Sequence, residues 1–161
     1  MRFTELLRGA TLQGDPTTLT AAACVKLGRG LGTLTRRRMG ASRARVVVAR
    51  GDDKNTVAVR DGIVRGLLLS GHDVKDIGTA PSDVFTFALK HLDAAAGVVI
   101  ADGDALSIMF FVGGRPLVGE GLQALGHLAD GEDFSAGEGS LDLVDVRPAF
   151  RARTTEAEES A

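Results

Sequence analysis

The chain has few of the residues that usually mark a specialised fold or site. Its 161 residues contain one cysteine, no tryptophan and no tyrosine, and aromatic residues make up 4% of the sequence. A single cysteine, Cys24, excludes an internal disulfide framework and suits a reducing compartment, so we expect a cytoplasmic protein. The scarcity of aromatic side chains argues against base stacking and against carbohydrate binding on an aromatic platform.

The sequence also lacks a strong charge bias and a long apolar run. Nineteen basic and 21 acidic residues give a formal net charge of −2, which provides no general attraction to nucleic acid or membrane. The basic segment 36–45 contains no aromatic residue, and arginines at a helix end complement the helix dipole, so no nucleic-acid partner is expected. No run of about 18 apolar residues occurs, and residues 1–20 show no signal-peptide pattern, so we expect no membrane partner.

The sequence does contain an alternation of strand and helix patterns. Apolar and β-branched runs predict strands at 44–50, 73–78, 96–101 and 107–112. Periodic apolar residues predict helices near 19–38, 56–70, 79–92 and 119–128. This order indicates a single three-layer α/β domain over residues 1–153, with helices on both faces of a mixed, mostly parallel sheet of about four strands. The polar segment 154–161 is expected to be a disordered acidic tail.

Three glycines, Gly28, Gly30 and Gly32, fall within the first predicted helix. Each lowers helix propensity by about 1 kcal/mol relative to alanine. Close packing against a neighbouring element is therefore the expected reason for their presence. Cys24 lies in the same helix and is expected to be a core residue without reactivity.

Polar residues follow the predicted strands at the sheet edge where ligands bind in such folds. The richest of these segments is 101–107, which carries Asp102, Asp104 and Ser107. Two carboxylates and a hydroxyl could hold a metal, transfer a proton or act as a nucleophile. They could also form a simple polar turn between two strands.

The residues favour the polar turn over these chemical alternatives. A Mg²⁺ site needs several hard oxygen ligands in an octahedral array, and this segment offers two carboxylates, so no metal or other cofactor is expected. Nothing in the sequence indicates surroundings that would separate the pKa values of Asp102 and Asp104, as acid–base work requires. Ser107 with His91 or His127 lacks an elbow motif and a third member.

Five segments occur in a recognisable order: "LTAAACVKLGRGLG", "RVVVAR", "GLLLSGHDVKDIGTAPSDVFTFALKHLDAAAGVVI", "IMFF" and "GSLDLVDVRPAF". Together they resemble the first, N-terminal domain of the α-D-phosphohexomutase family, the phosphoglucomutases and phosphomannomutases. The resemblance covers residues 3–151. It implies the α/β fold of that domain and a connection with carbohydrate metabolism.

The loop that carries the family's reactive serine differs in this chain. The family has "TASHNPPEYNG" between the two strands, whereas this chain has the shorter "ADGDALS". Gly103 occupies the position of the nucleophile, and Ser107 lies at the end of the loop. The resemblance therefore implies a degenerate active-site loop of Asp102, Gly103, Asp104 and Ser107, with no catalytic residue. A carboxylate that imitates the charge of a phosphoserine is a further alternative for Asp102 or Asp104.

The neighbouring family motif "GRDTR" corresponds here to "ARGDD". Arg50 is retained, Gly51 replaces the aspartate, and Asp53 replaces the second arginine. A carboxylate in place of a guanidinium would repel a phosphate. Arg8, Arg50 and Lys54 remain the candidate phosphate-binding residues, with a sugar phosphate as the candidate ligand.

Members of the family continue with three more domains, which carry the metal loop, the sugar-recognition loop and a further phosphate-binding loop. The chain shows none of these motifs, so we expect a pseudoenzyme. The leading hypothesis is a binding or assembly module that forms a homo-oligomer or docks to another protein. Two alternatives stay open. One is a phosphosugar-handling protein that retains phosphoglucomutase/phosphomannomutase-type intramolecular phosphotransferase activity with domains supplied in trans. The other is a sugar-phosphate sensor.

Overall fold

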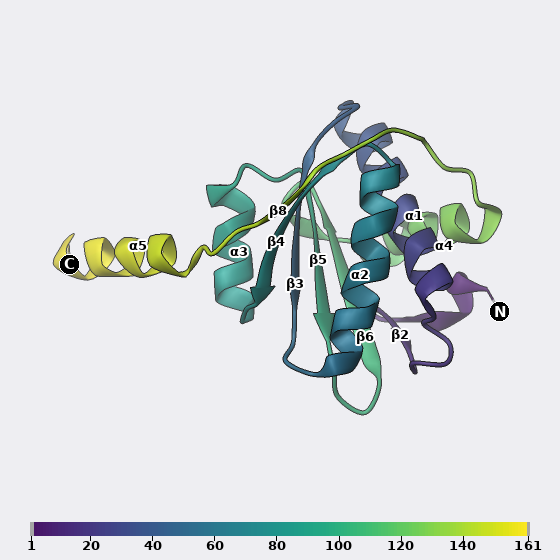
Figure 1. Cartoon of the computed structure of the whole chain (residues 1–161), viewed down its shortest axis with the longest axis horizontal. Coiled ribbons are helices and arrows are strands. Elements are labelled where there is room, and N and C mark those ends of the chain that lie inside the picture. Colours follow the sequence, from purple (N-terminus) through teal and green to yellow (C-terminus); the bar gives the residue numbers. More distant parts are fainter. Residues whose placement is uncertain (1, 161) are drawn as a thin grey trace.

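One mixed sheet forms the middle layer of the molecule (Figure 1). The computed structural model describes the backbone of residues 2–160 and the side chains of residues 2–153. Within this part the sheet has eight strands in the order β1-β2-β6-β5-β3-β4-β8, and β7 pairs with β6. The strands are β1 (Leu7–Arg8), β2 (Thr11–Gly14), β3 (Arg45–Arg50), β4 (Asp73–Thr79), β5 (Ala96–Ala101), β6 (Leu106–Val112), β7 (Arg115–Pro116) and β8 (Leu141–Leu143).

The predicted sheet of about four mostly parallel strands is wrong. Strand β3 pairs in parallel with β4 and β5, and β4 does so with β8, but the pairs β1–β2, β2–β6, β5–β6 and β6–β7 are antiparallel. The link from β5 to β6 spans residues 102–105. A link this short permits an antiparallel hairpin, because a parallel crossover needs about a dozen residues or more. The hairpin of β1 and β2 was missed because its strands are too short to show an alternating pattern.

Helices cover both faces of the sheet, as predicted. The helical elements are η1 (Phe3–Leu6), α1 (Ala21–Met39), α2 (Lys54–Leu69), α3 (Ser82–His91), α4 (Gly119–Gly131) and α5 (Arg147–Ser160). Helices α1, α2 and α4 share one hydrophobic core with the sheet, and α3 and the start of α5 share the other. In β3, Val46 and Val48 face the first core, whereas Val47 and Ala49 face the second. A continuous apolar run predicts this burial on both faces.

The far end of α5 lies in the segment expected to be a disordered tail. The α5 backbone continues to Ser160 and projects away from the sheet (Figure 1). The side chains of 154–161 lie outside the described residues, so the expected disorder stays a prediction.

Among residues 2–160, no helix combines the length and apolarity needed to cross a bilayer.

Helices α1 and α2 approach each other closely through small residues. A Cβ atom added at Gly28 would lie 2.2 Å from the backbone oxygen of Ile63, and one added at Gly32 would lie 2.5 Å from the Ser70 side chain. The expected close packing is therefore confirmed at these two glycines. At Gly30 the nearest atom belongs to α4 and would lie 3.5 Å away, an ordinary contact.

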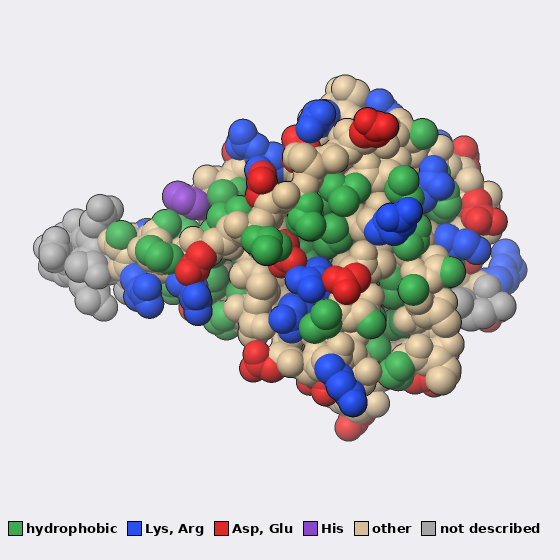
Figure 2. All heavy atoms as spheres, viewed as in Figure 1, with side chains coloured by type: hydrophobic (Ala, Val, Ile, Leu, Met, Phe, Trp, Pro, Cys, Tyr) green, Lys and Arg blue, Asp and Glu red, His purple; other side chains and the backbone are tan. Residues whose placement is uncertain are grey.

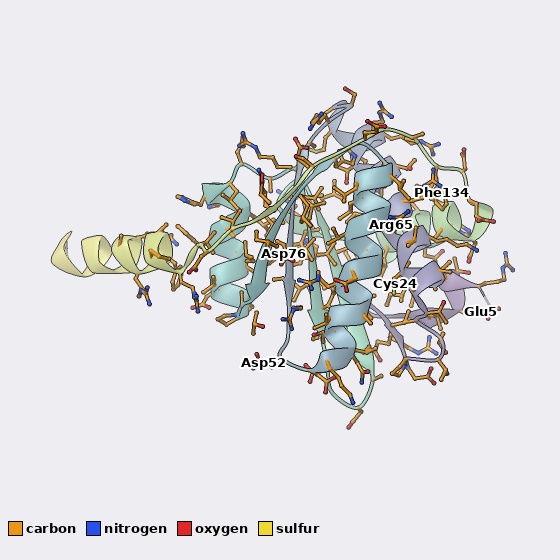
Figure 3. The ribbon with its side chains drawn as sticks, viewed as in Figure 1. Glu5, Cys24, Asp52, Arg65, Asp76 and Phe134 are labelled. Carbon is orange, nitrogen blue, oxygen red and sulfur yellow. The ribbon has the colours of Figure 1, made fainter. Side chains whose placement is uncertain are left out.

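Cys24 is a core residue, as expected. Its side chain is fully buried in α1 (Figure 3), and its Sγ lies 3.7 Å from the backbone oxygen of Leu19. Burial raises the pKa of the thiol to about 12. The thiolate is the reactive form of cysteine, so this side chain is inert at neutral pH.

His72 is a buried histidine whose two ring nitrogens are both occupied. Its Nδ1 accepts from the Ala44 backbone N–H at 3.0 Å, and its Nε2 lies 2.7 Å from the Gly32 oxygen, to which it donates in the neutral tautomer. Burial is the main cause that lowers the pKa of His72, with Arg36 acting in the same direction. The hydrogen bond to Gly32 and the nearby Asp73 oppose this shift. The folded protein therefore holds the neutral ring.

Replacing Gly28 with alanine tests the helix contact. We expect Gly28→Ala to lower the free energy of unfolding by about 1–3 kcal/mol, because the added methyl group has no space against the α2 backbone. Gly131→Ala is the matched control, since nothing lies within 4 Å of its added Cβ. The control should be neutral or slightly stabilising. Urea unfolding measures both, and equal stabilities for the two variants would contradict the close contact.

The pH dependence of stability tests the state of His72. In the unfolded chain, His72 binds a proton with the ordinary pKa of 6.5. In the folded protein, burial lowers the pKa of His72, so the folded state binds this proton less readily. Stability from this group is therefore complete above pH 6.5 and declines below it, by at most about 1.4 kcal/mol per pH unit. Urea unfolding between pH 8 and pH 5 should show this decline in the wild type, and a smaller one in His72→Gln. His127→Gln, at an exposed position, should keep the wild-type slope. If the free energy of unfolding depends on pH with the same slope in all three proteins, His72 does not cause the loss of stability below pH 6.5.

Candidate functional site

The loops after β3 and β5 meet at the carboxyl edge of the sheet, at the lower end of the molecule in Figure 1. The Gly51 N–H donates to the backbone oxygen of Ile100 at 2.9 Å, which joins the start of the loop after β3 to the end of β5. A Cβ atom added at Gly51 would lie 2.5 Å from Oδ1 of Asp102. The glycine therefore leaves room for this carboxylate beside the β3 loop, and the two predicted segments do come together.

Beside this junction lies a cavity of about 190 Å³ lined by carboxylates. Asp15 reaches it from the segment before α1, Asp53 from the loop before α2, and Asp102 and Asp104 from the β5–β6 link. Its lining residues, all in the described part of the chain, include no lysine or arginine. Four carboxylates in a lining without lysine or arginine favour a negative potential in the cavity, which disfavours a phosphate.

Asp53 has a structural role at the start of α2. Its Oδ1 accepts from the Asn55 backbone N–H at 2.7 Å, which makes it the N-cap of the helix. The Thr56 hydroxyl donates to the backbone oxygens of Gly51 at 2.8 Å and Asp53 at 2.6 Å. A helix N-terminus attracts anions. Here the chain's own carboxylate occupies that position.

The three candidate phosphate-binding residues do not converge on the cavity, and none of them lines it. Arg8 lies on β1, where its Nη1 donates to the backbone oxygens of Glu5 at 3.0 Å and Leu7 at 2.8 Å. Arg50 donates from Nη1 to the oxygen of the next residue at 2.9 Å, and its buried Nε has no hydrogen-bond partner among the described residues. Lys54 is exposed in the first turn of α2.

The degenerate loop itself is exposed, apart from its last member. Asp102, Gly103 and Asp104 are exposed in the link, whereas Ser107 is half-buried within β6. Ser107 pairs with Ala101 on one side and with β2 on the other. Ser107 is therefore part of the sheet and not of the loop.

The two histidines considered as partners of Ser107 lie elsewhere in the described part of the structure. His91 stacks on Phe87 with ring centroids 4.9 Å apart, and His127 lies in α4 on the other face of the sheet from α3. Neither histidine hydrogen-bonds to Ser107 in the described part of the chain. Among residues 2–153, no three histidine, cysteine, aspartate or glutamate side chains are arranged to hold a metal ion.

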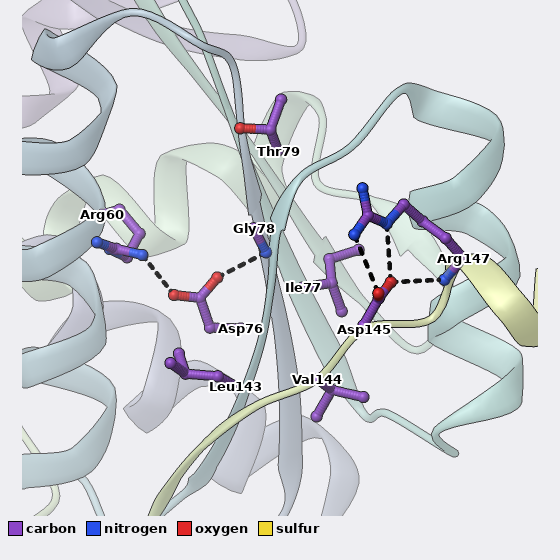
Figure 4. A pocket seen from close by; sticks show the side chains of 9 residues that line it. All are labelled: Arg60, Asp76, Ile77, Gly78, Thr79, Leu143, Val144, Asp145 and Arg147. Atoms are coloured by element: carbon purple, nitrogen blue, oxygen red, sulfur yellow. Dashed lines mark hydrogen bonds and ion pairs between the residues drawn. The ribbon is translucent and has the colours of Figure 1, made fainter.

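A larger cavity, of about 430 Å³, lies away from the predicted site, between β4 and the segment that leads from β8 to α5 (Figure 4). On one side, Arg60 donates to Asp76 at 2.6 Å, and Asp76 also accepts from the Gly78 N–H at 2.8 Å. On the other side, Arg147 donates to Asp145 at 2.9 and 3.0 Å. The Arg147 hydrogen bond lowers the pKa of Asp145 to about 2. Both guanidinium groups are thus neutralised by the chain's own carboxylates.

Sequence reasoning missed the Arg60–Asp76 pair, although a signal was present. Asp76 is two residues from Val74 in β4, so both side chains point to the core shared with α2. The Asp76 side chain is 2% exposed. A carboxylate at such a position requires a cation or several hydrogen-bond donors. Arg60 in α2 supplies the positive charge. Which residue pairs with Asp76 depends on how α2 packs against the sheet, and the strand pattern does not specify this packing.

Removing the α2 cap tests the structural role of Asp53. We expect Asp53→Ala to lower the free energy of unfolding by about 1 kcal/mol, through loss of the hydrogen bond to the helix N-terminus. Asp52→Ala is the control, since Asp52 is exposed at the same end of β3 (Figure 3) and caps no helix. Urea unfolding measures both. Equal losses in the two variants would show that charge, and not the cap, determines the effect.

Comparison with known proteins identifies this arrangement. Residues 4–101 match the family profile described as phosphoglucomutase/phosphomannomutase, alpha/beta/alpha domain I. A phosphomannomutase/phosphoglucomutase from Pseudomonas aeruginosa is 28% identical over 137 residues, which are 83% of this chain and 29% of that protein. A phosphoglucomutase/phosphomannomutase from Thermococcus kodakarensis is 37% identical over 82 residues, 51% of this chain and 18% of that protein.

The fold agrees with these matches. A crystal structure of a phosphoglucomutase/phosphomannomutase family protein from Burkholderia thailandensis superposes with a TM-score of 0.84 and 24% identity, covering 95% of this chain and 36% of that chain. The chain spans less than a third of the length of the curated relatives described above. The chain belongs to the phosphoglucomutase/phosphomannomutase family and corresponds to its α/β/α domain I.

Proposed function

We propose that this domain is a non-catalytic member of its family that serves as a binding or assembly module. The observation that carries the proposal is the cavity at the carboxyl edge of the sheet, which four carboxylates line without a lysine or arginine. Phosphoryl transfer depends on positioning and on positive charge around the transferred group. A site with this charge disfavours every phosphorylated state of a sugar or of an enzyme.

The β5–β6 link supports the same conclusion. Its four residues, Asp102, Gly103, Asp104 and Ala105, contain no hydroxyl, thiol or imidazole group. The nearest hydroxyl group along the chain belongs to Ser107, a residue of β6 that pairs with a strand on each side. The match to the family profile ends at Ala101, immediately before this link. The link thus lies outside the part of the chain that the family profile matches.

A binding role is supported by apolar side chains on the outermost strand. Leu141 and Leu143 of β8 are 45% and 79% exposed. Together with Val64 and Leu68 of α2 they line a further cavity, of about 410 Å³. Leucines this exposed on consecutive same-face positions of a strand favour contact with another protein surface.

Mass spectrometry of the intact protein tests the absence of catalysis. After incubation with glucose 1,6-bisphosphate and Mg²⁺, we expect the mass of the protein to be unchanged, because the link contains no hydroxyl group to accept the phosphoryl group as a stable ester. A phosphomannomutase/phosphoglucomutase such as the Pseudomonas aeruginosa relative is the positive control. A stable adduct of about 80 Da on this chain would contradict the proposal.

A thermal-shift experiment distinguishes this proposal from a sugar-phosphate sensor. We expect glucose 1-phosphate to leave the Tm of the wild type unchanged, since no cation lines the cavity among the described residues. A rise in Tm that is lost in Arg50→Ala would support the sensor instead, because Arg50 has a buried Nε without a hydrogen-bond partner in the described part of the chain.

A further inference from the structure

We propose that residues 132–144 form a strap over the edge of β4 that opens as a unit in mild acid, with His72 as the group that responds to pH. The strap begins after α4 and includes β8. In Figure 1 it crosses over the upper end of the sheet. Opening leaves the rest of the sheet folded and makes β4 an open edge strand. The inference goes beyond the proposed function and does not depend on it.

The strap makes little apolar contact with the domain. None of its residues is buried, and the half-buried ones are Phe134, Ser135, Gly139 and Val144. Figure 2 shows mainly charged side chains and backbone along the upper rim of the molecule, where the strap crosses. Segments with few buried contacts open at a lower cost in free energy than the core. The strap can therefore detach without unfolding of the sheet.

Backbone hydrogen bonds hold the strap to the end of α2. The Gly137 N–H donates to the oxygen of Leu69 at 2.9 Å, and the Gly139 N–H donates to the oxygen of Leu68 at 3.0 Å. Gly139 also packs directly on the backbone of His72, because an added Cβ atom would overlap the His72 oxygen. A change at His72 is therefore transmitted to the strap at a point of close contact.

Asp73 links the strap to the segment before β3. Its Oδ1 accepts from the backbone N–H of Ser140 at 3.0 Å and from the Ser140 hydroxyl at 2.7 Å. Arg43 donates to both oxygens of Asp73, at 2.9 and 2.8 Å. The hydrogen bond from Arg43 is the main cause that holds the pKa of Asp73 well below its ordinary value, so this carboxylate stays charged in mild acid. The attachment of Ser140 therefore depends on the position of Arg43.

His72 connects this attachment to pH. Its Nδ1 accepts from the N–H of Ala44, the residue after Arg43, at 3.0 Å, and its Nε2 lies 2.7 Å from the oxygen of Gly32. A protonated imidazole carries a hydrogen on both nitrogens, so Nδ1 no longer accepts from Ala44. Two donors then face each other. Their repulsion displaces Ala44 and the adjoining Arg43, which weakens the attachment of Ser140.

The surroundings of His72 resist this protonation while the strap is closed. Burial is the largest cause that lowers its pKa, and Arg36 of α1 acts in the same direction, whereas Asp73 opposes the shift. Arg43 offsets the charge of Asp73 through their ion pair, and Glu138 belongs to the exposed part of the strap. Loosening of these contacts lets the ring take up its proton more readily. Each pH unit below 6.5 therefore shifts the balance toward the open form by at most about tenfold.

Opening uncovers the backbone of β4. In the closed form the Val74 N–H donates to the oxygen of Ser140, and the Val144 N–H donates to the oxygen of Asp76, both at 2.8 Å. The open form leaves the Val74 N–H and the Asp76 oxygen without these partners. An unpaired edge strand accepts an extended segment of another chain. The strap is thus a pH-dependent cover of this edge.

Hydrogen exchange of the backbone amides, followed by NMR on the full chain between pH 7.5 and pH 5, tests this inference. After correction for the intrinsic exchange rate, we expect the amides of Gly137, Gly139 and Val144 to be less protected than those of β5 at every pH. Below pH 6.5 their protection factors should fall by up to about tenfold per pH unit. His72→Gln, whose side chain does not titrate, should remove this fall.

Ser140→Ala keeps the test decisive when His72→Gln does not fold, because Ser140 is exposed. Loss of its hydroxyl bond to Asp73 should lower the protection of the strap amides about two- to tenfold at pH 7.5 and leave β5 unchanged. Ser82→Ala is the matched control. Ser82 is exposed at the start of α3, near the carboxyl edge of the sheet, so this variant should protect the strap like the wild type. Circular dichroism confirms that each variant folds.

Strap amides that are as protected as those of β5 would overturn the inference. Protection factors that stay constant between pH 7.5 and pH 5 would also overturn it, as would a fall that His72→Gln retains. A phosphoryl adduct in the mass measurement would instead overturn the proposed function and leave the strap inference intact.

Discussion

The short connection between β5 and β6 is the constraint on which the rest of the structure depends. Four residues, 102–105, separate two long strands of the sheet. This length fixes the two strands as an antiparallel hairpin. Strand β6 in turn provides the edge on which β2 and then β1 are added. The connection also determines which groups stand at the carboxyl edge, because the residues that make the turn are the residues that face any ligand there.

Charge at that edge follows from the same connection. Asp102 and Asp104 come from the turn, and the fold places them next to Asp53, which α2 requires as its N-cap. Asp15, from before α1, completes the cavity lining. Each of these carboxylates has a local origin in a turn, a cap or a loop. Their sum is a negatively charged site at the carboxyl edge of the sheet. None of the candidate phosphate-binding residues Arg8, Arg50 and Lys54 lines this cavity.

The sequence predicted the parts of the fold whose signal is local. The apolar run of β3 indicated burial on both faces, and the glycines of α1 indicated a close helix contact, since each depends on a few neighbouring residues. The strand order and the hairpin of β1 and β2 could not be predicted, because they depend on pairings between distant segments. At the site, the meeting of the loops after β3 and β5 followed from the general geometry of parallel strands. The Arg60–Asp76 pair and the exposure of Leu143 required knowledge of which helix covers β4 and which strand ends the sheet.

The central claim is that the carboxyl edge of this domain no longer holds a phosphate, while the domain keeps its family's fold. A titration of the isotope-labelled protein with glucose 1-phosphate, followed through backbone amide resonances, tests it most directly. Residues 51–55 and 102–105 report on the carboxylate cavity. The account predicts that their resonances stay in place up to millimolar ligand. Saturable shifts confined to those residues would contradict it.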